Sequence, residues 1–169
     1  MSIIPTESIA SQDATTQTHK DAWNFVLSLM GNDADRAADL IKQVYHFFTD
    51  TSHKKIGLIF LGPVNNCGPL FIELILPIID NKLFLDYSYG GVVIAIDPND
   101  VDYVKERIYK VRPTKWLIAL NTLPDYVKDL SKYYDIKIIK FDTPFVGTFD
   151  LNDGAVEALH SMIIECNKQ

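Results

Sequence analysis

The stretch LIFLGPVNNCGPLFIELILPIID, residues 58–80, decides the fold of this chain. Its first apolar run ends at Gly62, and a continuous apolar run of this kind is typical of a strand buried on both faces. A short loop follows, and a second apolar segment begins at Gly68 with Glu73 as its only internal charge. That segment predicts a helix that is covered on more than one side and that Pro77 bends or ends. The stretch therefore predicts a strand, a loop and a buried helix.

Strand and helix patterns alternate from this stretch towards the C-terminal end of the chain. Continuous apolar strands that alternate with helices are typical of a mainly parallel sheet with helices on both faces. We therefore expect an α/β fold, a three-layer Rossmann-like arrangement of about five strands. The expected strands are residues 54–61, 82–88, 91–97, 115–121 and 135–142. The expected helices after the first strand are residues 68–80, 99–111, 124–134 and 153–166.

Two further amphipathic helices precede the first strand. Their apolar residues recur at helical spacing, Gly31 separates them, and Asn32 or Asp33 is the expected N-cap of the second. Residues 1–19 show no such period, so we expect a flexible N-terminal tail followed by a single α/β domain, residues 20–169. The expected inward faces are Ala22, Phe25, Val26, Leu29 and Met30 in the first helix, and Ala37, Leu40, Ile41, Val44, Tyr45 and Phe48 in the second.

The composition limits the classes of function. The 169 residues are 47% hydrophobic and 22% charged, which is ordinary for a globular protein. A formal net charge of -6 argues against non-specific binding to nucleic acid, which needs clustered Lys and Arg. No apolar run approaches the ~20 residues of a membrane span. The N-terminal residues do not resemble a secretory signal, and the two cysteines lack metal-finger spacing, so we expect a cytoplasmic protein.

The loops at the carboxyl ends of the strands are the candidate ligand sites, because ligands of open parallel sheets bind there. These loops are residues 62–68, 97–100, 121–124 and 142–148. The first loop precedes a helix start, which suits an anionic ligand. The candidate ligand-binding residues are Asn65, Asn66, Cys67, Gly68, Asp97, Asn99, Asn121, Thr122 and Thr143.

The first loop also has a simpler interpretation, which we favour. It lacks both the Gly-rich dinucleotide fingerprint and the Lys-Ser/Thr ending of a P-loop. Gly62 and the proline after it end the strand, and Asn66 or a neighbour caps the helix. Cys67 near a helix start is a candidate reactive thiol, although a loop thiol without an identifiable base is more often inert.

The second loop gathers carboxylates at a strand end. Asp97 and Asp100 suit Mg²⁺, which prefers hard oxygen ligands and often accompanies phosphate substrates. An N-cap Asp97 followed by a proline at the first helical position explains the same residues by helix capping alone. We expect no cofactor under the favoured capping interpretation, and Mg²⁺ at Asp97 and Asp100 under the alternative.

The remaining polar residues form no recognisable catalytic pattern. His46 and His160 fall beside the apolar helix faces, which predicts solvated side chains. Arg107, Arg112 and Lys115 form a candidate basic patch, although a solvated helix end explains them more simply. No Ser-His-Asp order or metal-histidine spacing is found in the sequence, which favours a non-enzymatic function but leaves an enzyme open, because such sites are assembled in space.

Residues 54–150 resemble the core of the type I phosphoribosyltransferases. KIGLIFLGPVNNCGPLFIELILPIIDNKLFLDY is similar to their first strand, pyrophosphate loop, helix and next strand. GGVVIAIDPND is similar to the strand before their phosphoribosyl pyrophosphate loop, and TKWLIALNTLPDYVKDLSKYYDIKIIKFDTPFVGTFD to their later strands and Thr-Pro loop. Asp97 matches the first acid of the family motif, but Pro98 replaces the second, and NDVDY replaces the Thr/Gly loop that grips the 5'-phosphate. The resemblance implies a fold relative without transferase chemistry, and convergent α/β patterning is the alternative.

Two classes of function are compatible with these observations. The favoured hypothesis is a non-catalytic binding or assembly module, a regulatory or scaffold subunit that contacts another protein or its own copies. The alternative is a Mg²⁺-dependent enzyme or sensor that binds a nucleotide or sugar phosphate, with residues 62–68 as its anion site. The sequence leaves the ligand, the partner and the oligomeric state open.

Overall fold

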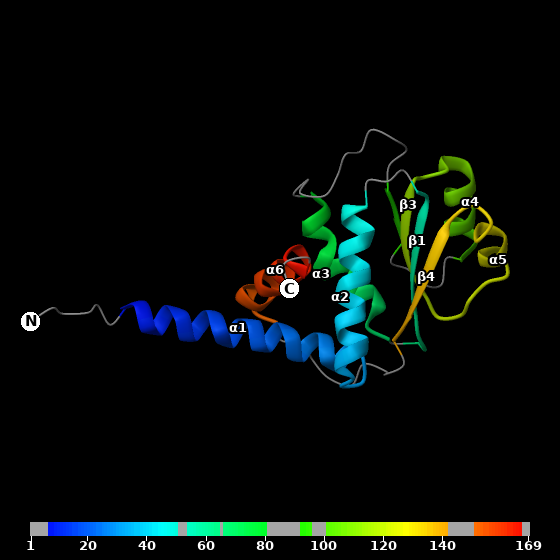
Figure 1. The fold of residues 1–169 in the computed structure, drawn as a ribbon. Helices are drawn as coiled ribbons and strands as arrows, with labels where there is room; N and C mark the ends of the chain where they lie inside the picture. Colours follow the sequence, from blue (N-terminus) through cyan, green and yellow to red (C-terminus); the bar gives the residue numbers. More distant parts are fainter. Residues whose placement is uncertain are drawn as a thin grey trace, which may run out of the picture.

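The computed structural model is a parallel sheet with helices packed against it (Figure 1). It describes residues 7–50, 54–64, 66–80, 92–95, 101–141 and 151–166. The described helices are α1 (Glu7–Leu29), α2 (Ala34–Thr49), α3 (Gly68–Asp80), α4 (Val101–Val111), α5 (Tyr126–Leu130) and α6 (Asp153–Ile164). The described strands are β1 (Ile56–Leu61), β2 (Val92–Ala95), β3 (Lys115–Leu120) and β4 (Asp135–Lys140).

The sheet is parallel in every described pairing. Its strand order is β2-β3-β1-β4, so β1 lies between β3 and β4. Ile56 of β1 is opposite Lys115 of β3 and Asp135 of β4, which aligns the amino ends of these strands. The prediction of an α/β fold is confirmed. Four strands are described where about five were expected, and the strand expected at residues 82–88 lies outside the described residues.

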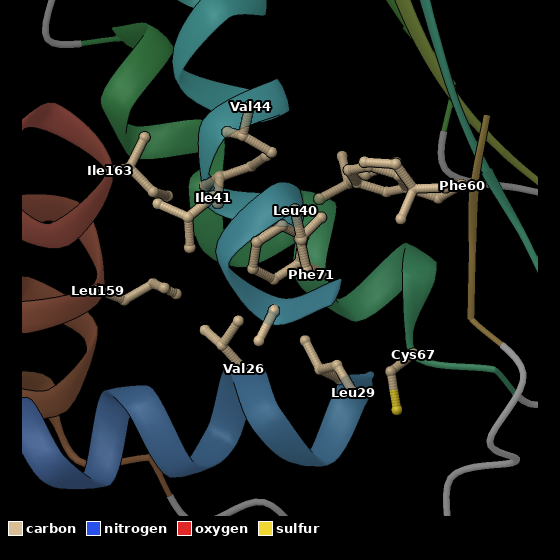
Figure 2. Packing of buried hydrophobic residues seen from close by; sticks show 14 of the residues in the cluster. Val26, Leu29, Leu40, Ile41, Val44, Phe60, Cys67, Phe71, Leu159 and Ile163 are labelled. Carbon is tan, nitrogen blue, oxygen red and sulfur yellow. The ribbon is translucent and has the colours of Figure 1, made fainter. Parts of the chain in front are cut away.

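Each face of the sheet carries its own apolar cluster, because successive strand residues point to opposite faces. Leu58 and Phe60 belong to the larger cluster, which includes residues of α1, α2, α3 and α6. Ile59 belongs to the smaller cluster, which includes residues of α4 and α5. Figure 2 shows the larger cluster, where Val26 of α1 and Leu159 of α6 point towards the same interior. Burial on both faces explains the continuous apolar pattern of the strands.

The two N-terminal helices pack largely as their apolar patterns predict. Every residue of the predicted α1 face is buried. Asp33 caps α2, because its carboxylate accepts hydrogen bonds from the N–H groups of Asp35 and Arg36 at 3.0 and 3.1 Å. The predicted α2 face is wrong at one position, since Tyr45 is only half-buried and Phe47 is buried.

Helix α1 begins at Glu7, well before the predicted first helix. Residues 7–19 are therefore helical although their sequence shows no amphipathic period; residues 1–6 lie outside the described part. The helix meets α6 near the end of this region, where a Cβ placed on Gly154 would lie 3.1 Å from the Thr18 methyl group. Packing of this kind stabilises helical turns whose own sequence shows no amphipathic period. The division into a tail and one domain stays a prediction.

Helix α3 is covered on most of its surface, as its apolar pattern predicts. Phe71, Ile72, Ile75 and Ile78 are buried, whereas Glu73 is exposed. The cover comes from the sheet and from α1, α2 and α6, whose residues share one cluster with α3. Despite this apolar character, neither α3 nor another helix in the described ranges has the length and hydropathy that crossing a membrane requires.

Pro77 lies inside α3 without ending it, and the turn before it makes a contact with α6. A proline lacks the N–H for the carbonyl four residues earlier, and its ring pushes the preceding turn open. The Nε2 atom of His160 lies 2.6 Å from the Leu74 carbonyl oxygen in that turn and donates a hydrogen bond to it. The prediction of a solvated His160 is therefore wrong, whereas His46 is exposed as predicted.

Candidate functional site

The winding of the chain changes direction between β1 and β3 at the carboxyl edge of the sheet. The chain leaves β1 towards α3, which packs on the face of the larger cluster, and leaves β3 towards α5 on the opposite face. Because β1 and β3 are neighbours, their loops diverge from one point. Ligands of open α/β sheets bind in crevices at such points. The predicted loops at residues 62–68 and 121–124 both begin here.

Asn66 lies between these two loops, and its side chain is used in internal hydrogen bonds. Its Oδ1 accepts from the Gly68 N–H at 2.7 Å, at the start of α3. Its Nδ2 donates to the carbonyl oxygens of Gly62 and Pro63 at 3.1 and 2.8 Å, and lies 3.5 Å from the Asn121 Oδ1. An amide has two N–H hydrogens, so this buried side chain has no donor left for a ligand. The geometry matches the capping interpretation of the loop.

The packing around Gly62 and Cys67 leaves little room inside the loop. A Cβ on Gly62 would overlap the Phe141 carbonyl oxygen, so only glycine fits there. Cys67 is 5% exposed, and burial raises the pKa of its thiol to about 11. A thiol that stays protonated at neutral pH is a poor nucleophile. Cys67 is therefore a packing residue at the start of α3.

The rest of the predicted site is only partly described. Gly68 is the first residue of α3, Asn121 is half-buried and Thr122 is exposed. Within the ranges that the structure describes, no three His, Cys, Asp or Glu side chains gather closely enough to hold a metal ion. The predicted ligand and metal residues that lie outside the described residues are Asn65, Asp97, Asn99, Asp100 and Thr143.

A pocket that the sequence did not predict lies at the opposite, amino edge of the sheet. Three of its lining residues come just before neighbouring strands: Lys55 before β1, Tyr134 before β4 and Arg112 shortly before β3. The parallel register brings these three positions together. The pocket has a volume of about 370 Å³, and we call it the amino-edge pocket. The other described residues that line it are Ile108, Tyr109, Leu130 and Tyr133.

Tyr134 forms part of the wall of the amino-edge pocket. Its hydroxyl donates a hydrogen bond to the Pro113 carbonyl at 2.7 Å, and its ring packs edge-to-face with the Trp116 ring, with 5.6 Å between the ring centroids. The Lys55 Nζ lies over the Tyr134 ring, 5.7 Å from its centroid. Burial raises the pKa of the Tyr134 hydroxyl, and the nearby positive charge of Arg112 opposes that shift. Both cations of the pocket therefore act on the same tyrosine.

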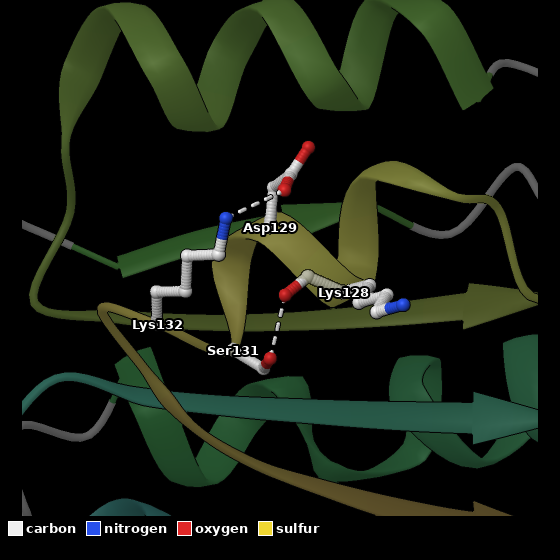
Figure 3. Close-up of polar contacts among 4 residues, drawn as sticks. All are labelled: Lys128, Asp129, Ser131 and Lys132. Atoms are coloured by element: carbon white, nitrogen blue, oxygen red, sulfur yellow. Dashed lines mark hydrogen bonds and ion pairs between the residues drawn. The ribbon is translucent and has the colours of Figure 1, made fainter.

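The turn after α5 places one tyrosine in the pocket wall and one at its rim. The N–H groups of Tyr133 and Tyr134 both donate to the Leu130 carbonyl at 2.9 Å. Figure 3 shows the ion pair between Lys132 and Asp129 in the same turn, with 3.1 Å between Nζ and Oδ1. Tyr134 is buried, whereas Tyr133 is 66% exposed. The turn thus places the largely exposed Tyr133 ring next to the buried Tyr134 ring.

Arg112 has a backbone conformation that favours glycine. Its φ is 50°, and its N–H donates to the Ile108 carbonyl at 2.9 Å, which closes the C-terminal end of α4 in the left-handed capping motif. A residue with a side chain in this region costs about 1 kcal/mol or more, and such outliers are often found at functional positions. The side chain is exposed, and no described carboxylate forms an ion pair with Arg112 or with Lys55.

Lys115 does not contribute to a basic surface patch, which corrects the grouping of three cations expected from the sequence. Its side chain is buried, and its Nζ donates to the Phe47 carbonyl at 2.7 Å in the last turn of α2. Burial lowers the pKa of this amine, and the charge of Asp50 opposes the shift. Arg107 and Arg112 are exposed, but only Arg112 lines the amino-edge pocket.

One signal in the sequence would have identified the amino-edge pocket. Arg112 and the Tyr133-Tyr134 pair come shortly before predicted strands, and Lys55 is the second residue of one. Because parallel strands start at one edge, residues in these positions gather there once the strand order is known. The strand order is not evident from the sequence.

No family model matches this chain, and no curated protein or solved structure matches it either. Function is therefore inferred from the two sites just described.

Proposed function

We propose that this protein is a non-catalytic α/β binding module, a regulatory or scaffold subunit that acts through protein-protein contacts. The observation that carries the proposal is the amino-edge pocket, where Tyr109 and Tyr133 are 42% and 66% exposed beside the Arg112 side chain. Tyr and Arg are enriched in protein interfaces and in their energetic hot spots, because each combines a large contact area with hydrogen bonding.

The position and chemistry of the pocket favour binding over catalysis. Enzymes with parallel sheets carry their catalytic groups at the carboxyl ends of the strands, and this pocket is at the amino ends. Among the described residues that line it there is no carboxylate or imidazole, which are the usual groups for proton transfer at neutral pH. At the carboxyl edge, the described polar groups of the first loop are used to cap α3.

Site-specific photo-crosslinking in cells tests this proposal. A benzoylphenylalanine at Tyr133 should form a discrete cross-linked product with one protein. The matched control is Tyr103, which is 56% exposed on α4 but does not line the pocket. Light scattering of the purified chain then separates binding to its own copies from binding to another protein. Products of the same kind at both positions, or a monomer without any product at Tyr133, contradict the proposal.

A second candidate function is a Rossmann-like, phosphoribosyltransferase-like site that binds a nucleotide or sugar phosphate with Mg²⁺. It is supported by the change of winding between β1 and β3, next to which Asn66 and Asn121 approach each other. Thermal unfolding with Mg²⁺-nucleotides and sugar phosphates tests it, since a ligand at 100 times its Kd raises stability by about 2.7 kcal/mol. A shift that Asp97→Asn abolishes favours this candidate over the binding module.

A further inference from the structure

We infer that the amino-edge pocket binds an acidic peptide segment of a partner protein, with a carboxylate side chain next to an aromatic or aliphatic one. The inference rests on the proposed function and adds the chemistry of the partner. It concerns the two cations, the exposed tyrosines and the helix end that surround the pocket.

The charge of the pocket differs from that of the chain. Lys55 and Arg112 line it, and none of its other lining residues that the structure describes is a carboxylate, although the whole chain has a net charge of -6. The neighbouring Lys132 pairs with Asp129 at 3.1 Å and is neutralised locally. An anionic side chain is therefore attracted to this pocket more strongly than to the surface around it.

The side chains of the pocket suit a carboxylate with an apolar neighbour. A guanidinium such as that of Arg112 binds a carboxylate through two parallel hydrogen bonds. The exposed rings of Tyr109 and Tyr133 provide flat, partly apolar surface for the adjacent side chain. The strained φ of Arg112 also agrees with a functional side chain, since glycine would occupy that backbone position at lower cost.

The helix end at the pocket favours a peptide over a phosphorylated ligand. Helix α4 ends at Val111, directly before Arg112, and its last turn contributes Ile108 and Tyr109 to the pocket lining. The negative end of the helix dipole disfavours any anion, and it disfavours a multiply charged phosphate, which prefers a helix N-terminus, more than a single carboxylate. A peptide can donate its backbone N–H groups to the last carbonyls of a helix while its carboxylate meets the cations.

Fluorescence of Trp116 provides a direct assay, because this ring contacts Tyr134 in the pocket wall. The full chain with Trp23→Phe has Trp116 as its only tryptophan. Two pools of synthetic peptides are titrated, with a fixed Glu-Phe-Glu or Gln-Phe-Gln centre and mixed Ala, Gly and Ser on both sides. The acidic pool should change the fluorescence saturably, with an affinity about tenfold higher than the neutral pool.

Matched variants assign the effect to the pocket. Arg112→Gln and Lys55→Gln should each weaken binding of the acidic pool about tenfold, which corresponds to the loss of one charged hydrogen bond. Arg107→Gln removes the same charge from α4 outside the pocket and should leave binding unchanged. Arg112→Gly removes the side chain while favouring the observed φ. This variant should therefore bind the acidic pool more weakly, while its melting temperature does not decrease.

Several results would overturn the inference. These are equal affinities for the two pools, no saturable change up to about 1 mM peptide, or equal effects of Arg107→Gln and Arg112→Gln. Tighter binding of phenyl phosphate than of the acidic pool would assign the pocket to phosphorylated ligands instead. If the pools fail but Tyr133 still cross-links to a partner, the binding function stands and only the acidic chemistry is wrong. If neither experiment succeeds, the proposed function fails as well.

Discussion

The Cys67 thiol links the packing of one residue to the stability of the protein at high pH. Burial raises its pKa from an ordinary 9.0 to about 11 in the folded state. A raised pKa means that the folded state holds the proton more tightly, so the stabilisation is complete below pH 9 and is lost between pH 9 and about 11. The thiol therefore contributes to the decrease of the unfolding free energy in this range, by on the order of 2 kcal/mol.

We predict that Cys67→Ser flattens this part of the pH profile. The measurement is urea unfolding at several values between pH 8.5 and about 11, and Cys166→Ser, which removes a half-buried cysteine, is the control. A profile with the same slope in Cys67→Ser and in the unchanged protein contradicts the prediction.

Gly57 makes room for the largest buried side chain of the sheet. It is opposite Trp116 in the pairing of β1 with β3, and a Cβ on Gly57 would overlap the indole ring. We predict that Gly57→Ala lowers the unfolding free energy by about 1–3 kcal/mol, the usual cost of overpacking. With Trp116→Leu in the same chain, the added methyl group should cost less, because the smaller side chain leaves space.

Urea unfolding of both single variants and the double variant measures this coupling. Gly154→Ala is the control, because its Cβ would meet the Thr18 methyl group at 3.1 Å and the Asn152 Oδ1 at 3.4 Å without overlapping a buried ring, and alanine favours the helix. If the losses of unfolding free energy in Gly57→Ala and Trp116→Leu add up in the double variant, the methyl group added by Gly57→Ala does not press on the Trp116 ring, and the prediction is wrong.

At the scale of the elements, Lys115 joins the C-terminal end of α2 to the first residue of β3. Its Nζ donates to the Phe47 carbonyl, which lies among the last carbonyls of the helix and has no partner within it. A cation at this end also stabilises the helix dipole. The contact holds α2 against the sheet, although burial lowers the pKa of the amine.

We predict that Lys115→Met destabilises the protein by about 1–3 kcal/mol, because the variant leaves the Phe47 carbonyl without its donor. Thermal and urea unfolding measure the loss. Lys140→Met, at an exposed position in β4, is the control and should stay within about 0.5 kcal/mol of the unchanged protein. An equal, small effect of both substitutions would show that the buried hydrogen bond contributes little.

At the scale of the whole molecule, the two apolar clusters share the strands between them. Leu58 and Phe60 of β1 belong to one cluster and Ile59 to the other, so neither cluster persists without β1. We therefore predict one cooperative unfolding transition for both faces of the sheet, as expected of a single domain. The two tryptophans report separately, since Trp116 belongs to the smaller cluster and Trp23 packs against the larger one.

The measurement compares fluorescence with far-ultraviolet circular dichroism in Trp23→Phe and in Trp116→Phe. Within each variant, both signals should have the same midpoint. A lower midpoint for Trp23 fluorescence than for dichroism would mean that α1 detaches before the sheet unfolds, and the assignment of residues 20–169 to one domain would then be wrong.

Local patterns in the sequence were sufficient for most of the elements. The period of the apolar residues predicted α2, α3 and the four described strands. This works because the spacing of apolar residues along an element indicates which of its faces is buried. The Asp33 cap and the role of Asn66 at the start of α3 follow from short-range chemistry in the same way. The sequence by itself thus determined an α/β fold.

Contacts between distant segments decided the rest. Helix α1 begins at Glu7 and meets α6 near Thr18, His160 contacts a turn of α3, and Lys115 is buried under α2. The amino-edge pocket exists because β4, β1 and β3 are neighbours, which brings Tyr134, Lys55 and Arg112 together. No local period specifies which strands pair, since pairing depends on the free energy of packing the whole chain. For this reason the sequence alone determined most of the elements and most of their buried faces, and only the tertiary structure revealed the pocket.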